Sequence, residues 1–246
     1  MIRGFAYWFL GGIVTLLWGL MHLLVYPFLS KRQDLYHKSV GHWARFLLRV
    51  FCGVHLEVEG LGNIRSGRSY IIVSNHRSYT DILVGNASLK TQFRWLAKKS
   101  LFGIPIIGWS MHFAGYIPVV RERAVSASKS LDRTAEVLQS GVSVWIFPEG
   151  TRTPELKLGS FKRGAFRLAR ETGVSLLPVV LAHTERIFPR PCIIRPQRVS
   201  VIVMKPLDPA GFIQNGMSER AVEEKLMNTV RDVIQRTYDA RTSRPS

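Results

Sequence analysis

The side chains best suited to catalysis lie in one short segment, residues 75–81, which reads Asn-His-Arg-Ser-Tyr-Thr-Asp. It directly follows Tyr70–Ser74, a run of β-branched and aromatic residues that predicts a strand. Open α/β sheets bind ligands just beyond the carboxyl ends of their strands, where His76 would lie. If a helix begins near Tyr79, Asp81 lies in its first turn. Its carboxylate then reaches back to one imidazole nitrogen and leaves the other free to accept a proton. The spacing predicts a His–Asp general base.

Taken alone, this pair also has an ordinary explanation. An acidic residue in the first turn of a helix is favoured by the helix dipole whatever its neighbours do. A histidine shortly before such a helix can be a simple residue of a surface loop. The catalytic interpretation of His76 and Asp81 therefore needs support from the rest of the chain.

Three further segments carry groups suited to binding an anion. Residues 147–152, Phe-Pro-Glu-Gly-Thr-Arg, follow another predicted strand and precede a helix, so exposed backbone and an arginine meet there. Residues 115–121 predict a short strand that ends at Arg121, and residues 98–105 begin at Lys98. Each segment alone can also be a solvated charge or a turn. Their occurrence together, in this order, favours one binding site.

The hydrophobic pattern predicts the elements that hold these segments. From about residue 54 onward, short β-branched or aromatic runs alternate with helical periodicity, which predicts an α/β domain with a largely parallel sheet flanked by helices. We expect this domain over residues 54–240 and a flexible tail at 241–246. Helices are expected after Tyr79, from Ala124 to about Gly141, from Lys162 to Gly173 and from Ser218 onward. The predicted strands are Val54–Glu59, Tyr70–Ser74, Phe93–Ala97, Tyr116–Val120, Val142–Phe147, Leu176–Ala182 and Val199–Met204.

The first thirty residues differ in character from the rest. No charged side chain occurs over Gly4–Ser30, and a helix of this length can reach across a hydrocarbon core of about 30 Å. A cleaved signal peptide is the alternative, but the apolar run is far longer than the core of such a peptide and no small-residue cleavage pattern follows. A second stretch, Val40–Val54, interleaves Arg45 and Arg49 with aromatic residues, which suits an anionic bilayer surface; packing on the core is the alternative. We expect two membrane-docking helices within residues 1–53.

Composition narrows the classes of function. The 246 residues include 34 lysines and arginines against 17 acidic residues, a formal charge of +17, so an anionic partner is expected. A nucleic acid is a poor candidate, because no zinc finger, helix-turn-helix or RNA-recognition pattern occurs and the uncharged first segment serves no such role. A metal-dependent hydrolase lacks support as well, since the seven histidines form no HExxH motif and the two cysteines no CxxC pair. No metal site is expected.

These motifs together resemble the glycerolipid acyltransferases, and within them the 1-acylglycerol-3-phosphate acyltransferases that make phosphatidic acid. The resemblance covers about residues 54–204. The chain departs from the family pattern at 153–155, Thr-Pro-Glu, where relatives often carry serine and basic residues, and this bears on the choice of head group. The matching segments are the HX4D motif at 76–81, a KKSL-x-x-IP stretch at 98–105, the second block at 115–121, the FPEGTR block at 147–152 and the proline-containing strand at 177–179.

The resemblance implies an activity. An acyl group would pass from acyl-CoA or acyl carrier protein to the sn-2 hydroxyl of lysophosphatidic acid, with His76 as general base and Asp81 stabilising its imidazolium. Because no serine or cysteine is evident as a nucleophile beside His76, the acceptor is expected to attack directly. An acyltransferase of the same family acting on glycerol 3-phosphate or another lysophospholipid remains the alternative. A scaffolding membrane protein would be expected to lack His76 or Asp81.

The resemblance also implies the remaining site residues and the setting. Arg121 and Arg152 would hold the acceptor phosphate with Lys98 as a weaker candidate, and no cofactor is implied. More positive charge follows the first apolar run than precedes it, so the catalytic domain is expected to face the cytoplasm from an anionic membrane. The expected substrate-binding residues are Asn75, Lys98, Arg121, Glu149, Gly150, Thr151 and Arg152; Glu149 would orient an arginine or a glycerol hydroxyl, and Gly150 and Thr151 would let backbone approach the reacting groups.

Overall fold

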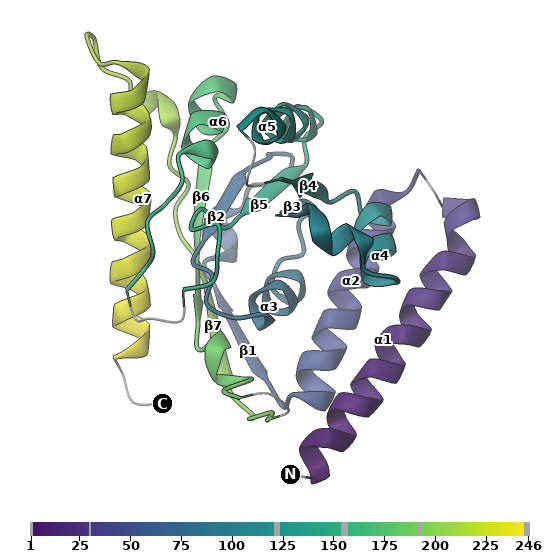
Figure 1. The fold of residues 1–246 in the computed structure, drawn as a ribbon. Coiled ribbons are helices and arrows are strands. Elements are labelled where there is room, and N and C mark those ends of the chain that lie inside the picture. Colours follow the sequence, from purple (N-terminus) through teal and green to yellow (C-terminus); the bar gives the residue numbers. More distant parts are fainter. Residues whose placement is uncertain (1, 30, 121–123, 154–156, 191–192, 244–246) are drawn as a thin grey trace.

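The computed structural model describes residues 2–29, 31–120, 124–153, 157–190 and 193–243. Its centre is a seven-stranded sheet in the order β1-β7-β6-β2-β5-β3-β4 (Figure 1). In the part of the chain described, neighbouring strands are parallel except β6 and β7. The predicted α/β fold is confirmed, and each predicted strand is present to within one residue at either end. The strands are β1 (His55–Glu59), β2 (Ile71–Ser74), β3 (Phe93–Lys98), β4 (Ile117–Val119), β5 (Ser143–Ile146), β6 (Leu176–Ala182) and β7 (Arg198–Val203).

Helices cover both faces of this sheet. The principal ones are α1 (Ile2–Leu29), α2 (Gln33–Phe46), α3 (Thr80–Ser88), α4 (Ile107–Phe113), α5 (Ala124–Gln139), α6 (Gly164–Thr172) and α7 (Glu219–Thr242). The predicted signals at two helix ends are confirmed. Ser218 accepts a hydrogen bond from the Ala221 N–H at the start of α7, and Gly173 ends α6 with φ +69°, a conformation that glycine adopts readily. Helix α7 continues through Thr242, so residues 241 and 242, which were predicted to belong to a flexible tail, are helical.

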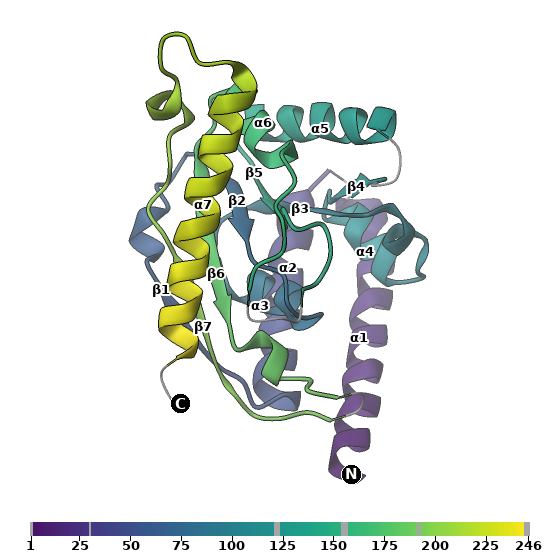
Figure 2. The ribbon, with the colours of Figure 1, turned by 60° about the vertical axis from the view of Figure 1, so that its left-hand side comes forward.

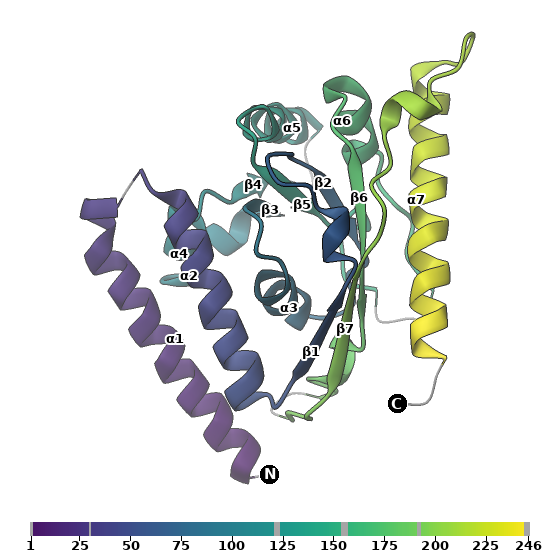
Figure 3. The ribbon, with the colours of Figure 1, turned by 180° about the vertical axis from the view of Figure 1, so that it is seen from behind.

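The sheet separates two hydrophobic cores, because successive side chains of a strand point to opposite faces. Along β2, Ile72 belongs to the core shared with α2 and α3, whereas Ile71 and Val73 belong to the core shared with α5, α6 and α7. Figure 3 shows the resulting layers: α1 lies outermost, then α2, then α3, then the sheet, with α7 on the far side. Four residues of β2 are fully buried at the centre of this arrangement, so the segment that follows β2 starts from a rigid support.

Helix α1 lies against the domain with much of its surface exposed. Over Tyr7–Leu29 it is long and apolar enough to cross a membrane, and only 11% of its most apolar stretch is buried in the protein. Its inner side is fixed to α2 by polar and aromatic contacts: Trp18 Nε1 donates to Ser39 Oγ at 3.0 Å, and His22 Nε2 lies 2.8 Å from the same oxygen. The Trp18 ring also stacks on that of Trp43. The predicted helix over the first apolar segment is confirmed.

The second predicted helix, Val40–Val54, is wrong in its bounds. Helix α2 starts at Gln33, and after Phe46 the chain continues as a π-helical turn over Leu47–Phe51. The start was missed because Arg32 provides no side-chain cap and the first turns are polar. Arg45 donates to the Ala87 carbonyl at the end of α3, so this arginine is bound to the domain.

Candidate active site

The segment after β2 is anchored at its first residue. Asn75 is fully buried, its Nδ2 donates to the Leu181 carbonyl at 2.8 Å, and the Leu181 N–H donates back to Asn75 Oδ1 at 2.9 Å. Both ends of the amide are therefore used to join the segment to β6. Asn75 was predicted to bind substrate; in the structure its buried amide oxygen and nitrogen both bond the Leu181 backbone, which is the contact of a residue that holds the segment in place.

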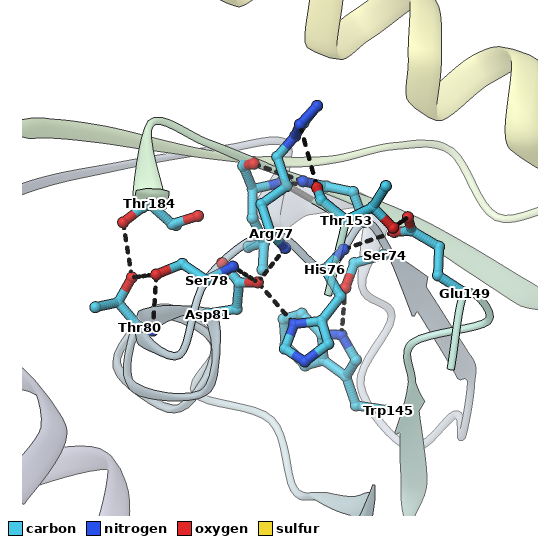
Figure 4. A network of polar contacts seen from close by, with 12 residues as sticks. Ser74, His76, Arg77, Ser78, Thr80, Asp81, Trp145, Glu149, Thr153 and Thr184 are labelled. Atoms are coloured by element: carbon cyan, nitrogen blue, oxygen red, sulfur yellow. Dashed lines mark hydrogen bonds and ion pairs between the residues drawn. The ribbon is translucent and has the colours of Figure 1, made fainter. Parts of the chain in front are cut away.

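His76 and Asp81 form the predicted pair. Nδ1 of His76 lies 2.8 Å from Oδ2 of Asp81, which is buried and also accepts the backbone N–H groups of Arg77 at 2.7 Å and Ser78 at 2.9 Å (Figure 4). Asp81 lies in the first turn of α3, as expected. The imidazole also stacks on Phe147, with ring centroids 3.9 Å apart and planes at 13°. Two contacts thus fix the ring and leave Nε2 directed away from Asp81.

Glu149 joins the His76 segment to the loop after β5. Its Oε1 accepts the His76 N–H at 2.8 Å, and its Oε2 accepts from the Thr153 hydroxyl at 2.5 Å and the Gly159 N–H at 2.9 Å. The Thr153 N–H donates to the His76 carbonyl at 2.9 Å, which closes the connection. Glu149 was predicted to orient an arginine or a glycerol hydroxyl; in the structure its buried carboxylate accepts from three donors of the protein itself, so its contacts are those of a residue that supports the loop.

Arg77 supports residues 75–81 from the side opposite the His76 ring. Its side chain is buried and points away from the His76 ring, toward α7 (Figure 4). Helix α7 runs along β6 on this side of the sheet (Figure 2). The guanidinium lies 4.3 Å from the centre of the Tyr238 ring, and Nη1 donates to the Thr153 carbonyl at 3.5 Å. Burial raises the pKa of Tyr238 to about 12, so its hydroxyl stays protonated. Sequence reasoning missed this contact, since nothing local connects two residues so far apart in the chain.

One cavity of about 370 Å³ brings the reactive and charged groups together. His76, Lys98, Thr151 and Arg152 line it, as predicted for a shared site, and the Arg152 guanidinium lies 3.4 Å from the centre of the Tyr79 ring. Gly150 lines a neighbouring cavity instead. Its φ is +71°, and the Lys162 side chain lies where a Cβ at this position would project. Arg121 lies outside the described residues.

Apolar cavities continue from this site toward α1. One of about 320 Å³ shares Tyr79, Ile82 and Trp95 with the catalytic cavity and reaches Thr15 and Trp18 of α1. Another, of about 440 Å³, lies between α1 and the segment after α2. The walls of both are almost entirely apolar. Cavities that share lining residues thus extend from His76 to α1.

No cluster of metal ligands accompanies the site. Over the ranges that the structure describes, no three His, Cys, Asp or Glu side chains lie together in a way that could hold a metal ion. The acidic side chain at the imidazole, Asp81, instead accepts three hydrogen bonds at Oδ2, from His76 and from the backbone N–H groups of Arg77 and Ser78. The site can therefore provide an oriented imidazole base beside two cationic groups, Lys98 and Arg152.

Fold and site together define an α/β protein with a His–Asp pair at the end of a central strand. The chain belongs to the acyltransferase family, whose model matches residues 55–182. It is 35% identical over 213 residues to a chloroplastic 1-acyl-sn-glycerol-3-phosphate acyltransferase of Arabidopsis thaliana, covering 84% of this chain and 59% of that protein. The chain therefore spans about six tenths of the length of this relative.

Two further comparisons cover more of the matched protein. A 1-acyl-sn-glycerol-3-phosphate acyltransferase of Pseudomonas aeruginosa is 32% identical over 182 residues, which is 72% of this chain and 70% of the relative. The crystal structure of the 1-acyl-sn-glycerophosphate (LPA) acyltransferase PlsC from Thermotoga maritima matches with a TM-score of 0.74 and 26% identity, covering 98% of this chain and 99% of that one. The N-terminal helices are thus part of the shared architecture.

Proposed function

We propose that this chain transfers an acyl group from a thioester donor to the sn-2 hydroxyl of 1-acylglycerol 3-phosphate, giving phosphatidic acid. The relatives carry this activity in their names. The observation that supports it best is the single cavity that holds His76, Lys98 and Arg152 and adjoins apolar cavities beneath α1. The reaction requires these three things: a general base, cations for a phosphate and space for a fatty acyl chain.

His76 is the proposed general base. Because Asp81 Oδ2 lies 2.8 Å from Nδ1, this arrangement assigns the proton to Nδ1 and leaves Nε2 as the acceptor. Nε2 takes the proton of the sn-2 hydroxyl as the oxygen attacks the thioester carbonyl, and Asp81 stabilises the imidazolium. The tetrahedral intermediate then collapses with cleavage of the C–S bond. The imidazolium returns the proton to the leaving thiolate, so the products are an ester and a free thiol.

In the proposed reaction no acyl-enzyme forms. A covalent route needs a serine or cysteine hydrogen-bonded to the base. The neighbouring serines are engaged elsewhere: Ser74 Oγ accepts from Trp145 Nε1 at 2.7 Å, and Ser78 Oγ accepts from the Thr80 hydroxyl at 2.9 Å. Among the residues described, Asp81 alone is hydrogen-bonded to the His76 ring. The acceptor hydroxyl is therefore the nucleophile.

Arg152 and Lys98 are the proposed ligands of the acceptor phosphate. Both line the cavity of His76, and an arginine guanidinium can bind two phosphate oxygens at once. Arg121 stays a predicted third ligand on the strength of the family resemblance. In 1-acylglycerol 3-phosphate the phosphate and the reacting hydroxyl are on adjacent carbons, so a phosphate bound beside Arg152 brings the sn-2 oxygen toward His76. The donor, acyl-CoA or acyl carrier protein, supplies only the thioester.

The proposed setting is the cytoplasmic face of an anionic membrane. Contacts hold α1 along the domain from Tyr7, which meets Phe51, to Tyr26, which stacks on Phe113. A helix fixed over this length cannot cross a bilayer without drawing polar parts of the domain into it. A shallow course in one leaflet, with the exposed face of α1 in lipid, avoids that cost and places the apolar cavities next to the acyl chains of the substrates.

An acceptor panel tests the function. The full-length protein in phospholipid–detergent micelles is offered lysophosphatidate, glycerol 3-phosphate or lysophosphatidylcholine with radiolabelled oleoyl-CoA. The proposal expects labelled phosphatidic acid to dominate, because only lysophosphatidate offers both a chain for the apolar cavities and an unmasked phosphate for Arg152 and Lys98. Faster acylation of glycerol 3-phosphate or lysophosphatidylcholine contradicts the proposed acceptor while keeping the chemistry.

A further inference from the structure

We propose that Tyr79 is a positioning residue that holds Arg152 at the junction of the phosphate site and the acyl cavities. The inference rests on the proposed function and adds to it a residue that selects acceptors carrying both a phosphate and an acyl chain. Tyr79 lies between His76 and Asp81 in the chain, but its role is separate from theirs. Within the described part of the chain, its side chain makes no hydrogen bond or ring contact with either member of the pair.

The contact with Arg152 is close. The guanidinium carbon lies 3.4 Å from the centre of the Tyr79 ring, which is the separation of two flat groups in van der Waals contact. An edge-on guanidinium would push its N–H groups into the ring at this distance, so the two groups must lie nearly face to face. In that arrangement the N–H donors lie in the guanidinium plane and point sideways. They remain available to a phosphate, while the ring limits the orientations of an otherwise exposed arginine.

Tyr79 lies where three cavities meet. Of the residues that the structure describes, it is the one that lines the catalytic cavity and both apolar cavities. Its side chain is also largely exposed, with 74% of the residue accessible, so it is not held there by burial in the core. A large aromatic residue kept at the meeting point of three cavities, with an arginine stacked on it, is arranged for a ligand that extends into more than one of them.

The shape of the acceptor fits this junction. In 1-acylglycerol 3-phosphate the phosphate and the acyl chain leave from opposite ends of a three-carbon backbone, and the reacting hydroxyl lies between them. With the hydroxyl at His76, the phosphate lies toward Arg152 and the chain enters an apolar cavity, so both pass the Tyr79 ring. Tyr79 therefore couples the two recognition events at one side chain.

Enzyme kinetics on matched variants test this inference. We compare Tyr79→Leu, Tyr79→Phe, Arg152→Ala and the double variant Tyr79→Leu/Arg152→Ala, as full-length protein in micelles with lysophosphatidate and oleoyl-CoA. A lost cation–π contact corresponds to about a 2- to 30-fold rise in the KM for lysophosphatidate. Tyr79→Leu should show that rise with the KM for oleoyl-CoA within about twofold, and Tyr79→Phe should restore the wild-type value, because it keeps the ring.

The double variant distinguishes positioning from simple lining of the cavity. If Tyr79 acts through Arg152, removing the ring has no further effect on the KM once the guanidinium is gone. Independent effects, with the double variant equal to the product of the single ones, would overturn the inference. Arg152→Lys gives a second readout, since an ammonium keeps the charge but can neither stack as a plane nor bind two phosphate oxygens as a fork, and it should raise the KM at least as much as Tyr79→Leu does.

The outcomes separate this inference from the proposed function. If the wild-type protein does not acylate lysophosphatidate, the proposed function fails. If it does so and Tyr79→Leu leaves the KM unchanged, or raises the two substrate KM values equally, only the role of Tyr79 is overturned. Arg198→Ala is the control for loss of an exposed arginine, because Arg198 lies in β7, on the far part of the sheet from β3 and β4. It should leave both KM values unaltered.

Discussion

Replacement of Glu149 by glutamine tests whether this carboxylate supports the His76 segment or contacts substrate. The carboxylate accepts three hydrogen bonds, from the His76 N–H, the Thr153 hydroxyl and the Gly159 N–H. Glutamine has the same shape but only one acceptor oxygen. If that oxygen faces His76, the amide NH₂ faces the Gly159 N–H, and two donors oppose each other. The Thr153 hydroxyl can rotate and accept a hydrogen bond from the amide NH₂, so only the Gly159 N–H loses its partner.

The expected loss of stability follows from this count. One buried donor without a partner costs about 1–3 kcal/mol, and the exchange of two charged hydrogen bonds for neutral ones adds to it. For a chain of this size each kcal/mol lowers the melting temperature by about 2–4 °C. We expect Glu149→Gln to melt several degrees below wild type. We also expect a lower kcat, since the His76 backbone loses a fixed partner, with little change in the KM for lysophosphatidate.

Thermal melting and steady-state kinetics on the same preparation measure both effects. Glu171→Gln is the matched control: Glu171 pairs with Arg167 at 2.8 Å on the exposed side of α6, and surface pairs of this kind contribute less than about 1 kcal/mol. It should melt close to wild type. The reasoning is refuted if Glu149→Gln has the same melting temperature as the control variant and a raised KM for lysophosphatidate, because that is the result of a lost substrate contact.

Three further predictions concern other parts of the structure. Asp81→Asn should lower kcat by about 10²- to 10⁴-fold, because an amide does not stabilise the imidazolium; a kcat within tenfold of wild type in the acylation assay contradicts this. Tyr238→Ala should destabilise the protein by about 3–5 kcal/mol in chemical denaturation and lower kcat through Arg77, whereas Tyr238→Phe keeps the ring and should do neither; equal effects of both variants contradict the ring contact. Arg3→Cys, with the native cysteines replaced, should react with an impermeant thiol reagent only in inverted vesicles; labelling from outside intact cells contradicts the shallow course of α1.

The sheet could be predicted because its information is local. Strands buried on both faces are continuous apolar runs rich in valine, isoleucine and leucine, and β2, β5 and β6 have every residue buried. The start of α2 could not be found in the same way, because it lacks a capping side chain and its buried residues Tyr36 and Val40 are separated by polar ones. A helix that starts without a capping side chain is difficult to locate from the sequence.

The candidate site was predictable where partners are close in the chain. His76 and Asp81 are five residues apart, so a strand followed by a helix suffices to bring them together. Asn75 and Glu149 were assigned to substrate because their partners, the Leu181 backbone and the Gly159 N–H, come from other loops and strands that only the folded sheet brings close. Tertiary contacts thus decide which polar residues of such a motif can face a substrate and which ones hold the backbone.

The lining of the apolar cavities could not be predicted from the sequence. Which residues line these cavities depends on how α1 and α4 pack against α3. Ile106 and Ile107 face the apolar cavities, together with Trp18 of α1. Phe113 instead stacks on Tyr26 at 4.0 Å and belongs to the helix contacts. Periodicity identifies an apolar face but does not say whether a helix or a ligand covers it.

The most direct test of the account is the turnover of His76→Ala with lysophosphatidate and oleoyl-CoA. Nδ1 of His76 is bound to Asp81 and the ring rests on Phe147, so Nε2 is the base that the structure offers to the acceptor hydroxyl. Loss of a general base typically lowers the rate by about 10²- to 10⁴-fold. The account predicts a fall of this size in kcat with an unchanged melting temperature. A variant with the same melting temperature and near wild-type turnover would contradict it.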